Sequence, residues 1–336
     1  MNHPRVTVLM PVFNAECFLD QSIQSILNQS YQDFKFLIIN DGSTDNSLKV
    51  IEKYILDKRI ELISLQKNQG LISCLNIGLE KIYSQFIVRM DADDISHPER
   101  IRLLVEIMDS NPNVGICGTR VGEFALNIPK NIPIICDASI RAIHFFNCSI
   151  THASAIYRKD VISHFSIKYR LEYIHSEDND FITEILSVSE GRIIDLPLYF
   201  VRKHPNQVSA KFNNIQKQSS SIKRFEFLKN EIGLNLTNEE LMIYKALSYK
   251  EVGLFISEFE HIKDFTSKFK YSVLNHYEYK INKNLFIQIL YNRISLLYLR
   301  NSYIGVKLLI NYLRYFALDF NIFIFFRLSR RVFYGI

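Results

Sequence analysis

The chain has 336 residues, of which 48% are hydrophobic, 13% aromatic and 22% charged. This length and composition indicate a globular protein with one large domain or two smaller ones. The net charge of +5 is modest and no nucleic-acid recognition motif is present, so we expect no nucleic-acid partner. The five cysteines are odd in number and form no C-x-x-C pair, which argues against a disulfide framework or a zinc knuckle.

The N-terminal sequence MNHPRVTVLMPVFN holds a five-residue apolar run before Pro11. Such a run is too short for the core of a signal peptide or for a membrane span. The cysteine pattern fits a reducing compartment best. We therefore expect a cytoplasmic protein.

The first hundred residues alternate short β-type runs with helical periodicity. The expected strands are Val6 to Met10, Phe34 to Ile39, Ile60 to Leu65 and Phe86 to Met90. The apolar residues at helical spacing between them are Leu19, Ile23, Ile26 and Leu27, then Leu48, Ile51 and Ile55, then Leu71, Cys74, Leu75, Leu79 and Ile82. Strands that alternate with helices predict βαβ units and a mostly parallel central sheet flanked by helices, an α/β fold.

A helix start is expected after the fourth strand, in the sequence SHPE. Ser96 is the candidate N-cap, Glu99 its capping-box partner three residues on, and Pro98 lies in the first turn.

Three polar clusters follow expected strands directly. They are PVFN (Pro11 to Asn14), NDGSTD (Asn40 to Asp45) and DADD (Asp91 to Asp94). Ligands of parallel sheets bind at the carboxyl ends of strands, so the three clusters are expected to build one pocket. Because its rim is acidic, an anionic ligand there requires a divalent cation that bridges Asp oxygens to phosphate. Asp carboxylates can also accept hydrogen bonds from ribose hydroxyls or from a base N–H.

Each cluster also has a structural interpretation. DADD can be an acidic loop on a solvated surface, and NDGSTD a turn with a helix cap in which Asp41 and Ser43 satisfy backbone donors. An EF-hand is excluded for DADD, because counting from Asp91 places Ser96 where glycine is needed and Arg102 where glutamate is needed.

Six motifs, taken together and in this order, resemble the family 2 glycosyltransferases of the GT-A fold, which use nucleotide-sugar donors. The resemblance covers roughly residues 5 to 210. The motifs are VTVLMPVFNA (6 to 15), INDGSTDNS (39 to 47), NQGLISCLNIGL (68 to 79), RMDADDISHPERI (89 to 101), HSEDNDF (175 to 181) and YFVRKHPNQVS (199 to 209).

The resemblance implies a role for individual residues. Pro11 and Asp41 would contact the uracil of a UDP-sugar, Asp91 the ribose or the donor sugar, and Asp93 a Mn²⁺ or Mg²⁺ ion. His204 would reach the metal or the diphosphate. The rest of the implied nucleotide-sugar-binding set is Val12, Phe13, Asn14, Glu16, Asn68, Gly70 and Ala92. The sequence departs from the family pattern at Asn40, where Asp is frequent, and at Leu75, where many members have Arg.

The motif SEDNDF supplies the implied general base. Asp178 would take the proton of the acceptor hydroxyl during a single displacement that inverts the anomeric carbon, and Glu177 would position it. The motif opens an expected helix that contains Phe181, Ile182, Ile185 and Leu186, and a helix N-terminus stabilises a charged carboxylate. His152 either positions the acceptor or is a core histidine, and His175 is interpreted as structural.

The motifs stop near residue 212, so we expect a catalytic domain at 1–212 and a helical region at 213–336. The polar stretch NNIQKQSSSIKR is a candidate linker. From Asn301 on, five basic residues accompany one acidic residue, Asp319, among many aromatics. This segment is either a packed helix or an interfacial segment on anionic lipid, and its charges exclude a membrane-spanning helix.

The sequence thus predicts an inverting, metal-dependent glycosyltransferase of the hexosyltransferase class. Its expected partners are a nucleotide-sugar, with UDP as the nucleotide, and a glycan or lipid-linked glycan acceptor in lipopolysaccharide, capsule or exopolysaccharide biosynthesis. A sugar nucleotidyltransferase is the alternative enzyme, but PVFNAE lacks the Gly-rich basic phosphate loop that it would need. A non-catalytic, membrane-associated scaffold with the same fold is the alternative from another class.

Overall fold

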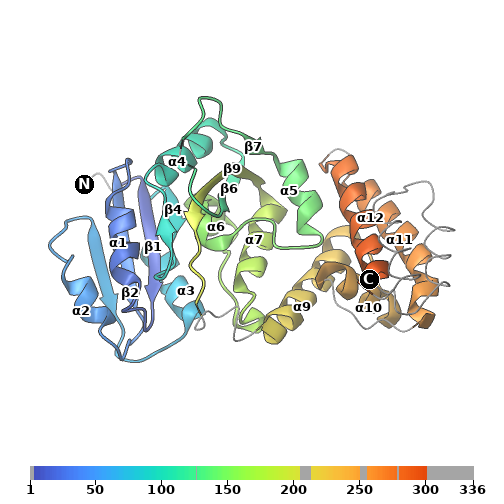
Figure 1. Ribbon diagram of the computed structural model, residues 1–336, viewed down its shortest axis with the longest axis horizontal. Helices are drawn as coiled ribbons and strands as arrows, with labels where there is room; N and C mark the ends of the chain where they lie inside the picture. Colours follow the sequence, from blue (N-terminus) through green and yellow to red (C-terminus); the bar gives the residue numbers. More distant parts are fainter. Residues whose placement is uncertain (1–3, 126, 205–212, 250–255, 278–279, 301–336) are drawn as a thin grey trace, which may run out of the picture. The chain divides into compact units, whose positions relative to one another are not determined.

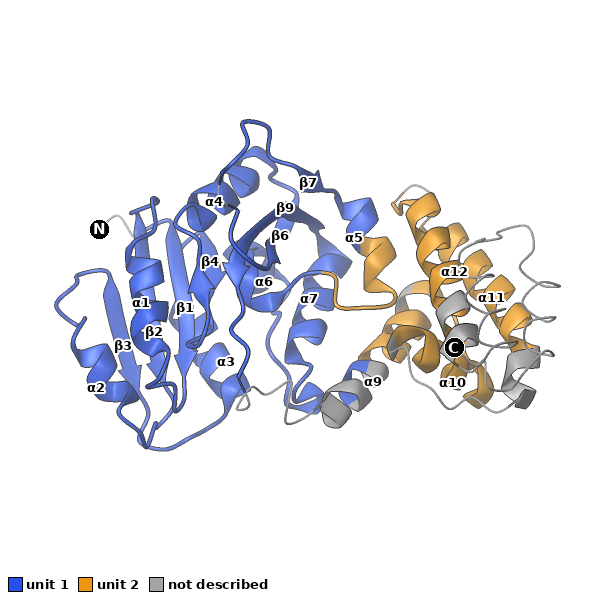
Figure 2. Ribbon diagram, viewed as in Figure 1, with its two compact units in different colours: residues 1–140, 150–220 blue, residues 141–149, 221–336 orange. Residues whose placement is uncertain are grey.

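The computed structural model describes residues 4–125, 127–204, 213–249, 256–277 and 280–300 (Figure 1). The chain divides into two compact units (Figure 2). The first comprises Met1–Ile140 and Ile150–Ser220, and the second Arg141–Ser149 and Ser221–Ile336. The second unit therefore includes a short segment from the middle of the chain, Arg141–Ser149. The predicted domain boundary at residue 212 stays a prediction.

The first unit is an α/β structure. Its strands are β1 Val6–Val12, β2 Phe34–Asn40, β3 Ile60–Ser64, β4 Phe86–Arg89, β5 Ile95–Ser96, β6 Val114–Val121, β7 Ile134–Ile135, β8 Ile156–Arg158 and β9 Glu190–Phe200. Its helices are α1 Leu19–Leu27, α2 Ser47–Glu52, α3 Leu71–Lys81, α4 Arg100–Ser110, α6 Lys159–His164 and α7 Glu177–Val188, with short 3₁₀ turns η1 His152–Ser154 and η2 Leu171–Tyr173. Helix α5 Asp137–His144 begins in the first unit and ends in the second.

Within the described residues, nine strands form one mixed sheet in the order β3-β2-β1-β4-β8-β6-β9-β5, with β7 paired to β9. Strands β3, β2, β1 and β4 are mutually parallel, and β6 is parallel to β9, whereas β8, β5 and β7 pair antiparallel to their neighbours. The predicted α/β fold with helices flanking a central sheet is confirmed. In the parallel part, the carboxyl ends of β2, β1 and β4 lie at one edge.

The four N-terminal strands were predicted from their apolar runs because both of their faces are covered. Val6, Val8 and Met10 of β1 and Phe86 and Val88 of β4 have no exposed surface. These strands belong to one large apolar cluster, and helix α3 packs on β1 and β2. Continuous apolar runs of this kind are typical of buried parallel strands.

Two local predictions are wrong. Helix α4 begins at Arg100 rather than after Ser96, because Ser96 pairs with Tyr199 in the short strand β5 and its hydroxyl accepts a hydrogen bond from Gln29. Helix α2 ends at Glu52, so Ile55 lies outside it and is 45% exposed.

The second unit is helical in its described residues. Its helices are α9 Asn213–Ile232, which starts in the first unit, α10 Asn238–Tyr249, α11 Ile256–His276 and α12 Lys283–Arg300. Phe145 and Phe146 insert into an apolar cluster of these helices, and the Phe146 ring stacks on Phe286 with 5.9 Å between centroids. Two residues of the expected linker, Ser219 and Ser220, are buried in α9, so the linker prediction is wrong and the helical prediction is confirmed.

The predicted interfacial segment, residues 301–336, lies outside the described residues. In the described part of the chain, every helix is too short or too polar to cross a membrane. The five cysteines, all of which the structure describes, form no disulfide.

Candidate active site

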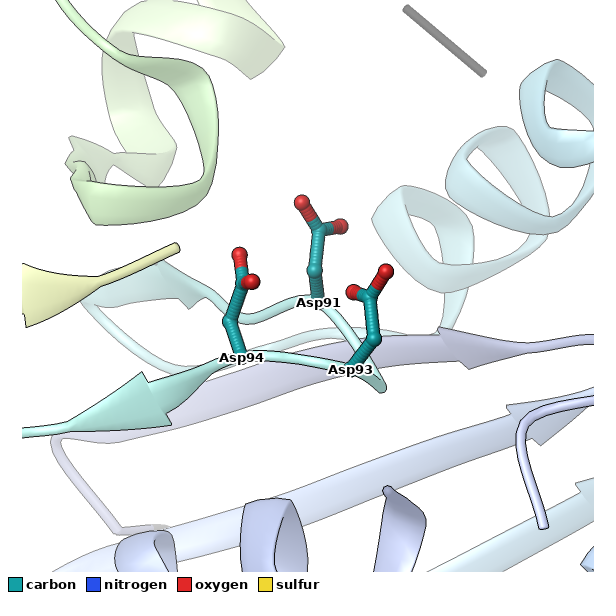
Figure 3. Close-up of side chains that lie close together, drawn as sticks. All are labelled: Asp91, Asp93 and Asp94. Carbon is teal, nitrogen blue, oxygen red and sulfur yellow. The ribbon is translucent and has the colours of Figure 1, made fainter. Parts of the chain in front are cut away.

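Asp91, Asp93 and Asp94 lie on the loop that joins β4 to β5. Their three carboxylates project side by side from the same side of this loop (Figure 3). One carboxylate oxygen of each residue lies within 4.8 Å of those of the other two. The loop therefore brings three negative charges into one small volume, as its position after a buried strand predicted.

Two of these carboxylates are held by residues outside the loop. Asp91 Oδ1 forms an ion pair of 2.6 Å with an Nη atom of Arg89, and the Asp91 backbone N–H donates to the Tyr199 hydroxyl at 3.1 Å. Asp94 accepts from the Arg202 backbone N–H at 3.0 Å and from the Tyr199 hydroxyl. Strand β9 and the residues after it thus fix the acidic loop.

The third carboxylate contacts a histidine. Asp93 Oδ2 lies 2.9 Å from His204 Nε2, although the two residues are 111 positions apart. Side chains of both residues are largely covered, with 30% of Asp93 and 16% of His204 exposed. The two residues that the sequence assigned to a metal are therefore neighbours.

Burial and the charges of neighbouring acids disfavour the charged forms of Asp91 and Asp94. Burial, and then the charges of Asp91 and Asp93, raise the pKa of Asp94 to about 8. Burial also raises the pKa of Asp91, and the neighbouring Arg89 offsets that effect only in part. A bound cation would reverse this balance, because its charge stabilises the ionised form of each carboxylate.

Two buried arginines lie next to the acidic loop and make hydrogen bonds around it. Arg89 is 2% exposed and Arg100 has no exposed surface. Arg100 donates from one Nη atom to the backbone oxygens of Arg89 and Ala153, and its guanidinium lies 4.9 Å from the centre of the Tyr199 ring. Sequence reasoning missed these contacts. The one available signal was an arginine inside the apolar run FIVRM, immediately before the acids.

The first two polar clusters meet at the same edge of the sheet. Val12 at the end of β1 pairs with Asn40 at the end of β2, and the Val12 backbone oxygen accepts from the Asp41 N–H at 2.8 Å. On the other side of β1, Leu9 pairs with Arg89 of β4. Pro11, Val12, Asp41 and the acidic loop are therefore assembled by three adjacent strands.

Asp41 organises the loop that begins α3. Its two carboxylate oxygens accept from the backbone N–H groups of Gln69 at 2.7 Å and Gly70 at 2.9 Å, and only 3% of the residue is exposed. Gly70 has φ of +89°, a conformation that favours glycine. Asn68 lies exposed beside these residues. Asp41 thus holds the predicted donor-binding loop in place, and its contact with a base stays a prediction.

Asn14 and Glu16 connect the loop after β1 to the loop after β2. Asn14 Oδ1 accepts from the Thr44 N–H at 2.8 Å, and Glu16 Oε2 accepts from the backbone and side-chain N–H groups of Asn46, both at 2.8 Å. Phe13 precedes them and is 48% exposed. These contacts give Asn14 and Glu16 a part in holding the two loops together, and the ligand contact of the exposed Phe13 stays a prediction.

Ala92 and the two positions that depart from the family pattern, Leu75 and Asn40, are apolar or hydrogen-bonded within the fold. Ala92 is 9% exposed, between the acids of the loop. Leu75, which departs from the family pattern, is fully buried in α3. Asn40 donates to the Ser64 hydroxyl at 2.9 Å and accepts from the Ser43 N–H, so an amide serves at this position.

Glu177 and Asp178 occupy the first turn of α7, as predicted, and Phe181, Ile182, Ile185 and Leu186 form its buried face. Burial, and then the charge of Asp178, raise the pKa of Glu177 to about 7. A third acid of this turn, Asp180, is fully buried and ion-paired with Arg170. The paired Asp180 has a structural role, which leaves Glu177 and Asp178 as the candidates for chemistry.

Tyr169 lies within the electrostatic reach of both groups of acids. Burial raises its pKa, and the charges of Glu177, Asp178 and Asp91 add to that effect. His152 Nε2 lies 2.7 Å from the Tyr169 hydroxyl, and burial lowers the pKa of His152 well below its usual value. His152 therefore has the aromatic and hydroxyl neighbours of a packed core histidine.

His175 precedes the acid pair with φ of +65°, a left-handed conformation that is uncommon for residues other than glycine. Its backbone N–H donates to the Glu177 carboxylate. The interpretation of His175 as a structural residue thus has a local contact in its favour.

Comparison with known proteins identifies the chain. It is 33% identical over 254 residues to an uncharacterized glycosyltransferase of Haemophilus influenzae, an alignment that covers 70% of this chain and 77% of the relative. The sequence model of glycosyl transferase family 2 matches residues 7–165. The chain belongs to glycosyltransferase family 2. The amylovoran biosynthesis glycosyltransferase AmsE of Erwinia amylovora is 31% identical over 201 residues, 57% of this family 2 chain and 73% of AmsE.

Solved structures share the GT-A fold. S. aureus TarS 1–349 in complex with UDP-GlcNAc matches with a TM-score of 0.51 at 17% identity, over 98% of this chain and 92% of that one. The mannosyltransferase PcManGT of Pyrobaculum calidifontis, in complex with GDP-Man and Mn²⁺, matches with a TM-score of 0.50 at 13% identity, over 100% of this chain and 88% of that one. The protein is thus a family 2 glycosyltransferase of the GT-A fold.

Proposed function

We propose that this glycosyltransferase moves a sugar from a UDP-sugar to a glycan acceptor, with inversion and with the help of a divalent cation. The observation that supports this most directly is the convergence of Asp91, Asp93 and Asp94 with His204, at the sheet edge where the donor loops meet. Asp178 supplies the base on α7.

The residues of the acidic loop fit a divalent cation. Carboxylate oxygens are the preferred ligands of Mg²⁺ and, with imidazole, suit Mn²⁺. Asp91 is already paired with Arg89, and Asp94 with Tyr199 and the Arg202 N–H. Asp93 and His204 are therefore the residues that would hold Mn²⁺ or Mg²⁺. When bound, the cation would supply positive charge to the departing diphosphate.

The other residues of the site would position the donor. Asp41 fixes the loop of Gln69 and Gly70, beside which a uracil is proposed to lie against Pro11. Asp91, oriented by Arg89, would accept a hydrogen bond from a ribose or sugar hydroxyl. The complexes of TarS with UDP-GlcNAc and of PcManGT with GDP-Man and Mn²⁺ support a nucleotide-sugar donor.

Asp178 would remove the proton of the acceptor hydroxyl. As that proton moves to Asp178, the acceptor oxygen forms its bond to the donor C1 and the bond from C1 to the diphosphate oxygen breaks. The attack comes from the face opposite the leaving diphosphate, so one step inverts the anomeric carbon. The helix N-terminus of α7 favours the charged form of the base.

The acceptor is proposed to be a glycan on a lipid carrier, in the assembly of a cell-surface polysaccharide. The similarity to AmsE, an amylovoran biosynthesis glycosyltransferase, supports this choice. The C-terminal helical region is proposed to serve the acceptor or a membrane surface on the cytoplasmic side.

Release of the nucleotide tests this proposal. Purified full-length protein would be incubated with UDP-sugars and GDP-sugars, in Mn²⁺, in Mg²⁺ and in excess EDTA, and free UDP and GDP measured. We expect UDP release with one UDP-sugar, loss of that release in EDTA, and loss in Asp93→Ala with the fold retained. Full activity of Asp93→Ala, or of the wild type in EDTA, would exclude the metal mechanism. Release of GDP alone would show that the donor is a GDP-sugar and not a UDP-sugar.

A further inference from the structure

Phe18 lies beside two residues of the chain that follows β9. Its ring centre is 4.8 Å from that of His204, with the planes inclined by 35°, and the guanidinium of Arg202 lies 5.3 Å from the centre of the same ring. Phe18 thus contacts both the histidine next to Asp93 and the arginine whose N–H binds Asp94.

Phe18 itself is held firmly. Its backbone N–H donates to Ala15 and its backbone oxygen accepts from Ser22, which fixes the residue at the start of α1. The next residue, Leu19, is fully buried in the core. The Phe18 side chain therefore projects from the well-packed start of α1. The residues that it contacts, Arg202 and His204, lie far from it in the sequence.

Arg202 and His204, by contrast, follow the last residue of β9, Phe200, and belong to no strand. The side chains that meet them set their positions. Arg202 hydrogen-bonds through its guanidinium to Gln21, one turn along α1 from Phe18. Residues at the start of α1 thus contact the segment that carries His204.

We propose that Phe18 is a positioning residue that keeps the His204 imidazole at the cation site. This inference rests on the proposed metal site. The flat ring of Phe18 restricts the tilt of the imidazole, and its attraction to the Arg202 guanidinium restrains the backbone two residues earlier. Outer-shell hydrogen-bond partners that orient a metal ligand typically contribute 10- to 100-fold to metal affinity, and we expect the ring contact of Phe18 to act at the lower end of that range.

Binding of Mn²⁺ alone tests the proposal. Free Mn²⁺ would be followed by electron paramagnetic resonance during titration of the full-length protein, with no nucleotide present. The variants are Phe18→Ala, Phe18→Trp, His204→Ala, Asp93→Asn and the double variant Phe18→Ala/His204→Ala. Phe165→Ala is the matched control, because Phe165 also contacts a histidine, His164, with 4.7 Å between ring centres.

We expect Phe18→Ala to weaken Mn²⁺ binding by about 10-fold or more, with Phe18→Trp restoring most of it. The Phe18→Ala change should have little further effect in the His204→Ala background, because its influence passes through the histidine. Phe165→Ala should bind as the wild type does. If Phe18→Ala loses secondary structure by circular dichroism, Phe18→Leu, which keeps an apolar side chain of similar bulk, replaces it.

The outcomes separate this inference from the proposed function. If Asp93→Asn and His204→Ala weaken Mn²⁺ binding but the Phe18 variants do not, the role of Phe18 is refuted and the metal site stands. Equal losses for Phe18→Ala in the presence and absence of His204 also refute it, since that result indicates a general structural effect. If Asp93→Asn and His204→Ala both bind as the wild type does, the metal site and this inference fail together.

Discussion

At the scale of single residues, the two acids of the first turn of α7 have different surroundings. Asp178 Oδ1 accepts from the Asn179 N–H at 2.7 Å, whereas the Glu177 carboxylate accepts from the His175 N–H and has its pKa raised by burial. A carboxylate that takes a proton in the rate-determining step cannot be replaced by an amide of the same shape. The pair therefore offers a direct comparison between a base and its neighbour.

We expect Asp178→Asn to lower turnover by roughly 10²- to 10⁴-fold while donor binding changes little, because the amide keeps the shape but accepts no proton. Steady-state kinetics with the active UDP-sugar, together with donor titrations, measure both quantities. Glu177→Gln is the matched control and should retain far more activity. If Glu177→Gln is inactive and Asp178→Asn is active, the general base is Glu177 and not Asp178.

The pKa of Glu177 gives a second prediction at this scale. Folding raises this pKa from 4.5 to about 7, through burial and the charge of Asp178, with Arg89 acting in the opposite direction. Between these two pH values the folded chain holds a proton that the unfolded chain has lost, so this group makes folding less favourable as pH rises. The effect is complete above pH 7 and absent below pH 4.

Glu177→Gln should therefore gain stability over the wild type as the pH is raised, by about 1–3 kcal/mol at pH 8, and little at pH 4. Urea unfolding at a series of pH values measures the difference. A difference between the two proteins that stays constant from pH 4 to pH 8 would contradict the assigned burial of this carboxyl.

At the scale of elements, strand β9 is bound to the acidic loop through one hydroxyl. The Tyr199 O–H donates to Asp94 and accepts from the Asp91 N–H, while its ring covers the buried Arg100. Removing the hydroxyl takes one partner from the part-buried Asp91 N–H and one from the buried Asp94 carboxylate, which keeps the Arg202 N–H. A loss of this kind costs about 1–3 kcal/mol.

Tyr199→Phe should accordingly unfold at lower urea concentration, with a loss of about 1–3 kcal/mol, and its Mn²⁺ affinity should fall as the loop loses its fixed shape. The measurements are urea unfolding and Mn²⁺ titration. Tyr271→Phe is the control, since Tyr271 is 70% exposed. Stability and affinity equal to those of the wild type would show that β9 does not fix the loop.

The elements themselves were largely predictable because buried strands and helix faces leave a period in the sequence. Val6 to Met10 and the α7 face of Phe181 and Ile185 are examples. Tertiary contacts decided the rest. The sequence around Ser96 is typical of a helix cap, but Ser96 pairs with Tyr199 of β9 and so lies in strand β5. The serines of α9 are typical of a linker in sequence, but Ser219 and Ser220 are buried in a helix.

At the scale of the whole molecule, the order of the strands along the chain determines which site residues can be predicted from the sequence. Residues that follow a strand directly, such as Asp41 and Asp91, were located by the chain order of strands alone. Arg89 and Tyr199 could not be located in this way, because no local sequence pattern shows which residues a polar side chain within a strand contacts. Their partners are set by strand pairing across the sheet, up to 108 residues apart.

The C-terminal sequence adds a prediction about membranes, since residues 301–336 carry five basic residues and one acid among aromatics. Full-length protein should sediment with vesicles that contain anionic lipid, and the triple variant Arg327→Gln/Arg330→Gln/Arg331→Gln should bind them less. Each basic residue near such a surface contributes about 1 kcal/mol, and salt screens the attraction. Equal sedimentation of both proteins at low salt would show that these arginines make no membrane contact.

Calorimetric titration of UDP into the full-length protein tests the central claim, a cation-assisted nucleotide site at the acidic loop, most directly. It would be run in Mn²⁺ and in excess EDTA, with Asp93→Asn beside Asp195→Asn, a matched change at an exposed acid paired with Arg120. We predict binding in Mn²⁺ that weakens by about 10-fold or more in EDTA and in Asp93→Asn, but not in Asp195→Asn. Equal UDP affinity in Mn²⁺ and in EDTA, or unchanged affinity of Asp93→Asn, would contradict the account.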